Sequence, residues 1–278
     1  MIGRIVKSLS NDYTVETQNQ KYTCKARGKF RNQNQTPLVG DFVEFDPNTN
    51  YILNIKPRKN TLPRPPVANI DTSYIITSLK EPDFSSNLLD KLILISEYNQ
   101  IKPIIVFTKK DLLTEKQWED LKKYIDYYQK IGYPVFLNTQ ISEIKQTFKD
   151  KFSVLTGQSG AGKSTLINKI DPSLNLQTNE ISKALNRGKH TTRHTEALEL
   201  AGGLVADTPG FSALDLSNLT KEDIRDNFTE FNNFECKYRD CIHVKEDGCL
   251  VKEKVKKGEI LQSRYENYLN FLQDKKVW

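Results

Sequence analysis

The feature that most constrains this chain is a glycine-rich turn at residues 157–165, GQSGAGKST, which follows a short apolar run at 152–156. Its three glycines leave the backbone free to curve, so that successive N–H groups can point at phosphate oxygens. Apolar residues then recur at helical spacing, which places the turn at a helix N-terminus, where anions are favoured. A strand, a turn and a helix in this order predict a P-loop that binds a nucleoside triphosphate.

Within this loop, two side chains carry the expected chemistry. We expect Lys163 to contact the outer phosphates and the Ser164 hydroxyl to bind magnesium. The rest of the loop is expected to surround the phosphates and comprises Gly157, Gln158, Ser159, Gly160, Ala161, Gly162 and Thr165.

A second motif, Asp-Thr-Pro-Gly, stands at 207–210 directly after an apolar run. Asp207 is placed to hold magnesium, directly or through water, and the Gly210 N–H to reach a γ-phosphate. Any Asp that ends a strand before a Pro-Gly turn looks similar. The P-loop upstream favours the nucleotide-site interpretation.

A third motif, Thr108-Lys109-Lys110-Asp111, follows the apolar run 104–107 and predicts which base is bound. An ionised Asp only accepts hydrogen bonds, and guanine offers two adjacent donors, its N1–H and its 2-amino group. Adenine offers an acceptor at that ring nitrogen. We therefore expect Asp111 to select guanine and the stem of Lys109 to lie over the base; the alternative is an ordinary solvated Lys-Asp loop.

Near the C-terminus, three cysteines and a histidine have the spacing of metal ligands. Cys236, Cys241, His243 and Cys249 form C-x4-C-x-H-x5-C, a complete tetrahedral set for zinc. Because four protein ligands leave no open position for water, we expect one structural zinc; chance clustering of buried cysteines is the alternative. The basic residues that follow predict either an RNA-facing surface or a solvated helix face, and they are Lys252, Lys254, Lys256, Lys257 and Arg264.

The first 60 residues alternate between apolar and polar side chains in about five short runs, which predicts a small antiparallel barrel of the oligonucleotide-binding (OB) type. This part carries ten basic and five acidic residues. The basic run 25–31, with Tyr22 and Phe30 nearby, favours nucleic acid through phosphate contact and base stacking. A solvated β surface is the alternative.

Length and composition complete the expected organisation. At 278 residues the chain is longer than a domain with a single hydrophobic core usually is. The proline-rich stretch 61–66 predicts a domain boundary. We therefore expect a barrel at 1–62, an α/β domain at 63–220 and a helical domain at 221–278. From residue 70 onward, strands alternate with helices, which we expect at 87–99 and at about 115–130, and this alternation predicts a mostly parallel sheet. No apolar run approaches the ~20 residues of a membrane span, and no secretory signal is visible, so we expect a cytoplasmic protein without a membrane partner. Nothing in the sequence suggests a coiled coil or a large apolar interface, so we expect a monomer.

The order of the motifs, TKKD, GQSGAGKS, HTTR and DTPG, carries a resemblance to a known family. TKKD resembles the NKxD guanine motif of GTPases, which in ordinary GTPases follows the P-loop; here it precedes the P-loop, which indicates a circular permutation. Thr108 stands at the position of the Asn that normally links the base loop to the P-loop, so a weaker grip on nucleotide is expected. The chain resembles the RsgA (YjeQ) family of ribosome-assembly GTPases. Besides the order of the motifs, the resemblance includes the metal-ligand spacing, VGD at 39–41, NID at 69–71, GKHTTRH at 188–194 and DTPGF at 207–211.

That resemblance implies a GTP hydrolase that binds the small ribosomal subunit and its rRNA, assists late maturation of that subunit, and leaves after GTP becomes GDP. Phe211 follows DTPG and cannot hydrogen-bond to an attacking water. The nearest substitute is His190, as the resemblance also suggests, with His194 a weaker candidate and rRNA contact an alternative role for His190. We expect Thr192, or else Thr191, to close on magnesium and the γ-phosphate.

Two other classes of function stay open. One is an RNA-binding module in which GTP is a regulatory ligand, which Phe211 favours. The other is a P-loop phosphotransferase acting on a small acceptor with ATP, against which TKKD speaks.

Overall fold

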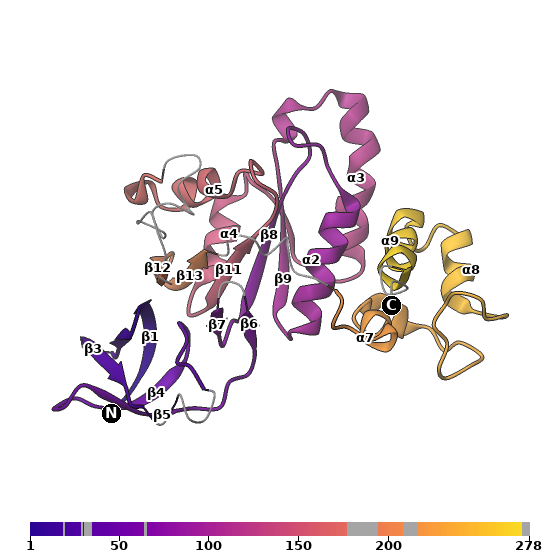
Figure 1. Ribbon diagram of the computed structural model, residues 1–278. Coiled ribbons are helices and arrows are strands. Elements are labelled where there is room, and N and C mark those ends of the chain that lie inside the picture. Colours follow the sequence, from indigo (N-terminus) through magenta and orange to yellow (C-terminus); the bar gives the residue numbers. More distant parts are fainter. Residues whose placement is uncertain are drawn as a thin grey trace.

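The computed structural model describes residues 1–18, 20–28, 30, 35–63, 66–176, 194–207 and 216–273. These residues form an N-terminal barrel, a central sheet flanked by helices, and a C-terminal helical domain (Figure 1). The barrel and the C-terminal helices lie at opposite ends of the molecule, on either side of the central sheet. The predicted three-part fold class is confirmed.

The N-terminal barrel has five strands, β1 (Ile2–Leu9), β2 (Asp12–Glu16), β3 (Lys21–Ala26), β4 (Phe42–Asp46) and β5 (Tyr51–Ile55). The ring closes because β1 pairs with both β2 and β4, while β5 pairs with both β3 and β4. Alternate residues point inward, as the sequence predicts, and Ile5, Val15 and Phe45 are fully buried. Phe30 is only 2% exposed and packs into this core, so the prediction that its ring stacks on nucleic acid is wrong.

The predicted proline-rich connector is a short ribbon. β6 (Thr61–Pro63) pairs antiparallel with β7 (Pro66–Ala68), and Pro63 lies opposite Pro66 at its end. Proline is tolerated at such an edge because its missing N–H is not needed by a third strand. The ribbon leads from the barrel into the first strand of the central sheet.

The central sheet has the strand order β10, β9, β8, β11, β13, β12. The first five run parallel, as predicted, and β12 is antiparallel to β13. Beyond β13, strand β12 also pairs with barrel strand β1, so the barrel and the central sheet form one continuous sheet. The bounds are β8 (Thr72–Ser78), β9 (Lys102–Thr108), β10 (Val135–Leu137), β11 (Phe152–Thr156), β12 (His194–Leu200) and β13 (Gly203–Asp207).

Helices cover both faces of this sheet, namely α2 (Ser86–Tyr98), α3 (Glu115–Lys130), α4 (Ile141–Phe148) and α5 (Lys163–Ile170), with short turns η1 (Lys110–Leu112) and η2 (Pro172–Leu174). Ile75 and Phe107 belong to the apolar cluster with α2 and α3, whereas Tyr74 and Val106 belong to the cluster with α4 and α5. Successive residues of β8 and β9 therefore face opposite sides. Helices α2, α3 and α5 agree with the sequence-based predictions, whereas α4, which is eight residues long, was not predicted.

The C-terminal domain contains α7 (Lys221–Asp226), η4 (Thr229–Asn233), α8 (Leu250–Lys256) and α9 (Gln262–Gln273). Arg264 on α9 is 1% exposed and donates hydrogen bonds to Asp90 on α2 and to Glu230 on η4. The prediction that Arg264 belongs to an RNA-facing surface is therefore wrong, because this guanidinium joins the C-terminal domain to α2. No helix among the described residues is long and apolar enough to cross a membrane.

Candidate nucleotide site and metal cluster

The P-loop connects β11 to α5, as its sequence predicts. Gly157 has a φ of +131°, and a Cβ at this position would lie 2.0 Å from the Ile76 carbonyl oxygen. Gly162, with a φ of +95°, is the N-cap residue of α5. Glycine is thus required where the loop passes β8 and where the helix starts.

Inside this loop, the Lys163 ammonium folds back over the backbone. Its Nζ donates hydrogen bonds to the carbonyl oxygens of Gly157 and Gln158, each at 2.8 Å. Lys163 is the first residue of α5 and Ser164 is the second. The ammonium and the helix N-terminus therefore lie on the same short loop, as a phosphate site requires.

The predicted guanine motif lies directly against the P-loop. Thr108 is 1% exposed, and its hydroxyl donates a 2.7 Å hydrogen bond to the carbonyl oxygen of Ala161. Its side chain is also 3.7 Å from the position of a Cβ on Gly162. Thr108 thus makes the link between base loop and P-loop that Asn makes in NKxD.

The residues after Thr108 include Asp111, the carboxylate that the sequence predicts to select guanine. Lys109 adopts a left-handed conformation, with φ of +60°, and its ammonium donates to the Glu81 carbonyl oxygen. Lys110 lies 3.9 Å from the centre of the Trp118 ring. Asp111 follows on η1 and is exposed. The carboxylate is therefore accessible to a ligand.

Sheet register brings the three motifs to one edge. Ser78 lies opposite Thr108, Ile75 opposite Thr156, and Leu155 opposite Asp207, all in parallel pairs. The guanine motif, the P-loop and the start of DTPG therefore follow the carboxyl ends of β9, β11 and β13. Ligands of open α/β sheets bind at this edge.

Several predicted site residues lie outside the described part of the chain. These are His190, Thr192 and Gly210, together with the alternatives Thr191 and Phe211. Asp207 is the last residue of β13, and only its backbone is described. The catalytic and magnesium roles of these residues stay predictions.

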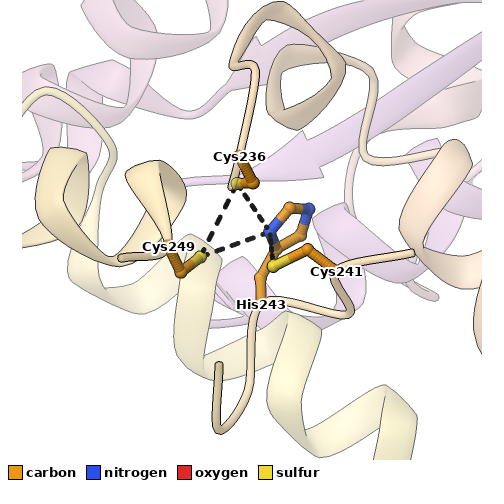
Figure 2. Close-up of side chains that lie close together, drawn as sticks. All are labelled: Cys236, Cys241, His243 and Cys249. Carbon is orange, nitrogen blue, oxygen red and sulfur yellow. Dashed lines mark hydrogen bonds between the residues drawn. The ribbon is translucent and has the colours of Figure 1, made fainter. Parts of the chain in front are cut away.

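The predicted metal ligands come together in the C-terminal domain (Figure 2). Their ligand atoms all lie within 4.8 Å of one another, and His243 Nδ1 is 3.6, 3.3 and 3.4 Å from the Sγ atoms of Cys236, Cys241 and Cys249. A tetrahedral zinc with Zn–S of about 2.3 Å and Zn–N of about 2.0 Å requires donor atoms about 3.5–3.8 Å apart. The cluster therefore has the donors and the spacing of a structural zinc site.

Neighbouring groups fix the ligand loop. The hydroxyls of Tyr265 and Tyr268 each donate a 2.6 Å hydrogen bond, to the His243 and Ile242 carbonyl oxygens respectively. The Glu246 carboxylate accepts from the Ile242 and Val244 N–H groups. Burial lowers the pKa of His243, which favours the neutral imidazole that binds metal.

The tripeptides VGD and NID, which carry part of the family resemblance, join the barrel to the P-loop strand. Gly40 has a φ of +96°, and a Cβ there would lie 2.0 Å from the Ala68 carbonyl oxygen; the Asn69 side chain donates to the Gly40 carbonyl oxygen at 3.1 Å. Asp71 accepts from the Phe152 N–H at 2.7 Å, at the start of β11. Burial would raise the pKa of Asp71, but the Lys59 ammonium and the Phe152 N–H outweigh it and lower this pKa.

Fold and site together define a class, namely a P-loop nucleotide-binding protein with a circularly permuted central domain, a barrel before it and a Cys3His cluster behind. The RsgA GTPase family model matches residues 55–217, and the RsgA N-terminal domain model matches residues 2–52. The chain belongs to the RsgA GTPase family and is a GTP hydrolase.

Curated relatives and solved structures match this chain along nearly its whole length. The chain is 51% identical to small ribosomal subunit biogenesis GTPase RsgA 2 of Oceanobacillus iheyensis, over 98% of this chain and 96% of the relative, and 50% identical to RsgA of Latilactobacillus sakei, over 97% and 94%. The crystal structure of YjeQ from Thermotoga maritima matches with a TM-score of 0.87 at 35% identity, covering 100% of this chain and 99% of that one. YloQ, described as a circularly permuted GTPase, matches with a TM-score of 0.83 at 37% identity, covering 99% and 94%.

Proposed function

We propose that this chain hydrolyses GTP to GDP and phosphate when bound to the small ribosomal subunit, and that it assists a late step in the maturation of that subunit. The observation that supports this most is the Thr108–Ala161 hydrogen bond, which holds the guanine motif against the P-loop. The named relatives are small ribosomal subunit biogenesis GTPases, which supports the choice of partner. We propose that the protein acts as a cytoplasmic monomer.

In this proposal, the two ends of the nucleotide are bound by different strand ends. Asp111 accepts hydrogen bonds from guanine N1–H and the 2-amino group, and the Lys109 stem lies over the base. Lys163 exchanges its bonds to the Gly157 and Gln158 carbonyl oxygens for bonds to the outer phosphates. The hydroxyls of Ser164 and Thr192 and the Asp207 carboxylate hold magnesium, which neutralises phosphate charge when bound.

We propose that His190 orients the attacking water, because Phe211 cannot. A neutral imidazole can accept a proton from that water or position it by a hydrogen bond. Because no Gln occupies the usual position, intrinsic hydrolysis is slow and depends on how the small subunit arranges the residues around His190.

Basic surfaces at the two ends of the molecule bind the rRNA in this proposal. On the barrel they include Lys25 and Arg27, and on the C-terminal domain they include Lys256 and Lys257, all of which are exposed. One structural zinc at Cys236, Cys241, His243 and Cys249 stabilises the domain that carries the second surface.

Phosphate release from GTP, measured with and without purified small subunits, tests this proposal. We expect small subunits to raise the wild-type rate at least tenfold, and Lys163→Ala to abolish turnover in both conditions because it removes the phosphate-binding ammonium. Lys169→Ala is the matched control, since Lys169 is an exposed lysine of the same helix.

Three outcomes separate the candidate functions. Unchanged turnover on adding small subunits contradicts the proposal. Tight binding of GTP and of RNA without GTP turnover supports an RNA-binding module in which GTP is a regulatory ligand. A preference for ATP over GTP supports a phosphotransferase.

A further inference from the structure

The loop that joins β8 to α2, residues 79–85, lies beside the nucleotide site, although it belongs to none of the predicted motifs. At its start, the Leu79 N–H donates a 3.1 Å hydrogen bond to the carbonyl oxygen of Thr108 in the guanine motif. Further on, Pro82 lies beside the P-loop, since a Cβ on Gly160 would be 3.7 Å from the Pro82 Cδ atom. This loop therefore borders both the guanine motif and the P-loop.

Two lysines cross between this loop and the guanine motif. The Lys109 ammonium donates to the Glu81 carbonyl oxygen. In the opposite direction, the Lys80 ammonium donates a 3.0 Å hydrogen bond to the Leu112 carbonyl oxygen. Leu112 is the last residue of η1 and directly follows Asp111. The Lys80 bond therefore holds the turn that carries the carboxylate predicted to select guanine.

The turn η1 has little else to fix its direction. It is three residues long, and none of them is buried. Leu112 is 39% exposed, so apolar packing contributes little to its position. The Lys110 ammonium over the Trp118 ring connects the turn to α3, and the Lys80 ammonium connects it to the β8–α2 loop. We therefore expect the direction of the turn to depend on these contacts from outside it.

The backbone from which the Lys80 side chain extends is itself fixed. The Ser78 hydroxyl donates a 2.6 Å hydrogen bond to the Lys80 carbonyl oxygen and accepts one of 3.3 Å from the Lys80 N–H. At the other end of the loop, Ser85 is the N-cap of α2 and accepts from the Leu88 N–H. Lys80 thus links η1 to a loop that is anchored at both ends.

We infer that Lys80 is a positioning residue for guanine selection: by holding the Leu112 carbonyl oxygen, it directs the Asp111 carboxylate so that this group meets the N1–H and the 2-amino group together. A carboxylate that accepts two adjacent donors needs both its oxygens in place, whereas a single donor can be met by a small rotation. This inference rests on the proposed role of Asp111 and adds a residue outside the guanine motif to it.

The test compares the binding of GDP and of inosine diphosphate, which lacks the 2-amino group, by isothermal titration calorimetry. We expect the wild type to bind GDP at least about tenfold more tightly, because inosine diphosphate forfeits one hydrogen bond to a charged group. Lys80→Met keeps an unbranched side chain but removes the donor, and should lower this affinity ratio at least about threefold. Lys80→Arg keeps a cationic donor and should restore the ratio to within about twofold of the wild type.

Lys116→Met is the matched control, since Lys116 is an exposed lysine on α3, shortly after η1 in the chain. It should keep the wild-type ratio. A merely structural role for Lys80 would weaken both ligands equally and leave the ratio unchanged. The ratio compares two ligands on the same folded protein, so partial unfolding of a variant does not alter it. A wild-type ratio in Lys80→Met, or an equal fall in Lys116→Met, overturns the inference.

Failure of this inference and failure of the proposed function are distinguishable. If the wild type prefers GDP and Lys80→Met prefers it equally, only the role of Lys80 is wrong. If the wild type binds both diphosphates equally, the proposed role of Asp111 is wrong, and the inference falls with it. Stimulation of GTP turnover by small subunits tests the ribosomal part of the proposal separately.

Discussion

At the scale of single residues, Thr108 is the side chain that joins the two halves of the nucleotide site. Its hydroxyl bonds to the carbonyl oxygen of Ala161, and Ala161 is fully buried. A buried carbonyl that loses its partner costs about 1–3 kcal/mol. The structure therefore contains the hydrogen bond that links the base loop to the P-loop. The expected loss of nucleotide affinity from Thr in place of Asn stays a prediction.

Thr108→Val should weaken GDP binding about tenfold, because valine keeps the shape of threonine but removes the donor to Ala161. Titration with a fluorescent GDP analogue measures this. Thr108→Asn, which keeps a donor, should stay within about threefold of the wild type.

Ser153→Ala is the matched control for that measurement. Ser153 lies on the P-loop strand, and its buried hydroxyl has no hydrogen-bond partner among the described residues. Its removal should leave GDP affinity unchanged, and an equal loss in Ser153→Ala and Thr108→Val would show that general loosening of the core, not the link, controls affinity.

Residue type and local sequence predict some site residues but not the burial of residues that contact distant segments. Lys163 and Asp111 could be singled out because their neighbours in the chain are a glycine-rich turn and the end of an apolar strand, and the structure places both at the carboxyl edge of the sheet. Their roles toward a nucleotide stay predictions. Phe30 and Arg264 were misjudged because their burial depends on contacts with distant segments. The roles of Asn69 and Asp71 were also hidden, since Asp71 meets Phe152 far along the chain.

At the scale of elements, the Cys3His loop holds η4, α8 and α9 together. Phe231 of η4 and Tyr268 of α9 pack around the His243 ring, at centroid distances of 5.8 and 6.4 Å. A metal bound here therefore stabilises the apolar core of the C-terminal domain as well as its own ligands.

Cys241→Ser should reduce bound zinc from one per chain to less than about 0.2, because it removes a thiolate from the tetrahedral set. Elemental analysis after dialysis measures the stoichiometry. Cys24→Ser removes a fully buried thiol in the barrel, outside the cluster, and should retain one zinc per chain. Full zinc content in Cys241→Ser would contradict the assignment.

Helices were predictable from the sequence where apolar residues recur at helical spacing over several turns. The sixteen-residue helix α3 begins at Glu115 and ends at Lys130, as expected, and carries a capping box between Thr114 and Gln117. α4 was missed because it buries only Ile144 and Phe148, too few apolar positions to establish a period. The β1–β12 pairing was also beyond prediction, since strand partners between domains leave no local signal.

At the scale of the whole molecule, both flanking domains are fixed to the central sheet. The barrel is joined through β1 and β12, and the C-terminal domain through a buried network of Arg264, Asp90, Glu230, Tyr128 and Asn267. Burial alone would lower the pKa of Arg264, but Glu230 and Asp90 outweigh it and raise this pKa, so the guanidinium stays charged.

Arg264→Ala should destabilise the protein by about 3–5 kcal/mol, because it leaves the buried Asp90 and Glu230 carboxylates without their cation. Urea denaturation measured by circular dichroism detects this as a lower midpoint. Lys256→Ala, at an exposed position on α8, is the control and should change stability by less than about 0.5 kcal/mol. Equal midpoints for the two variants would show that the network does not hold the domains together.

The central claim is that one guanine nucleotide spans the ends of β9 and β11, although the chain supplies these strands in permuted order. A crystal structure with a non-hydrolysable GTP analogue and magnesium tests it directly. We expect the Asp111 carboxylate within about 3.2 Å of guanine N1 and N2, and Lys163 Nζ within the same distance of the outer phosphates of the same molecule. A nucleotide whose base lies away from Asp111 while its phosphates occupy the P-loop would contradict the account.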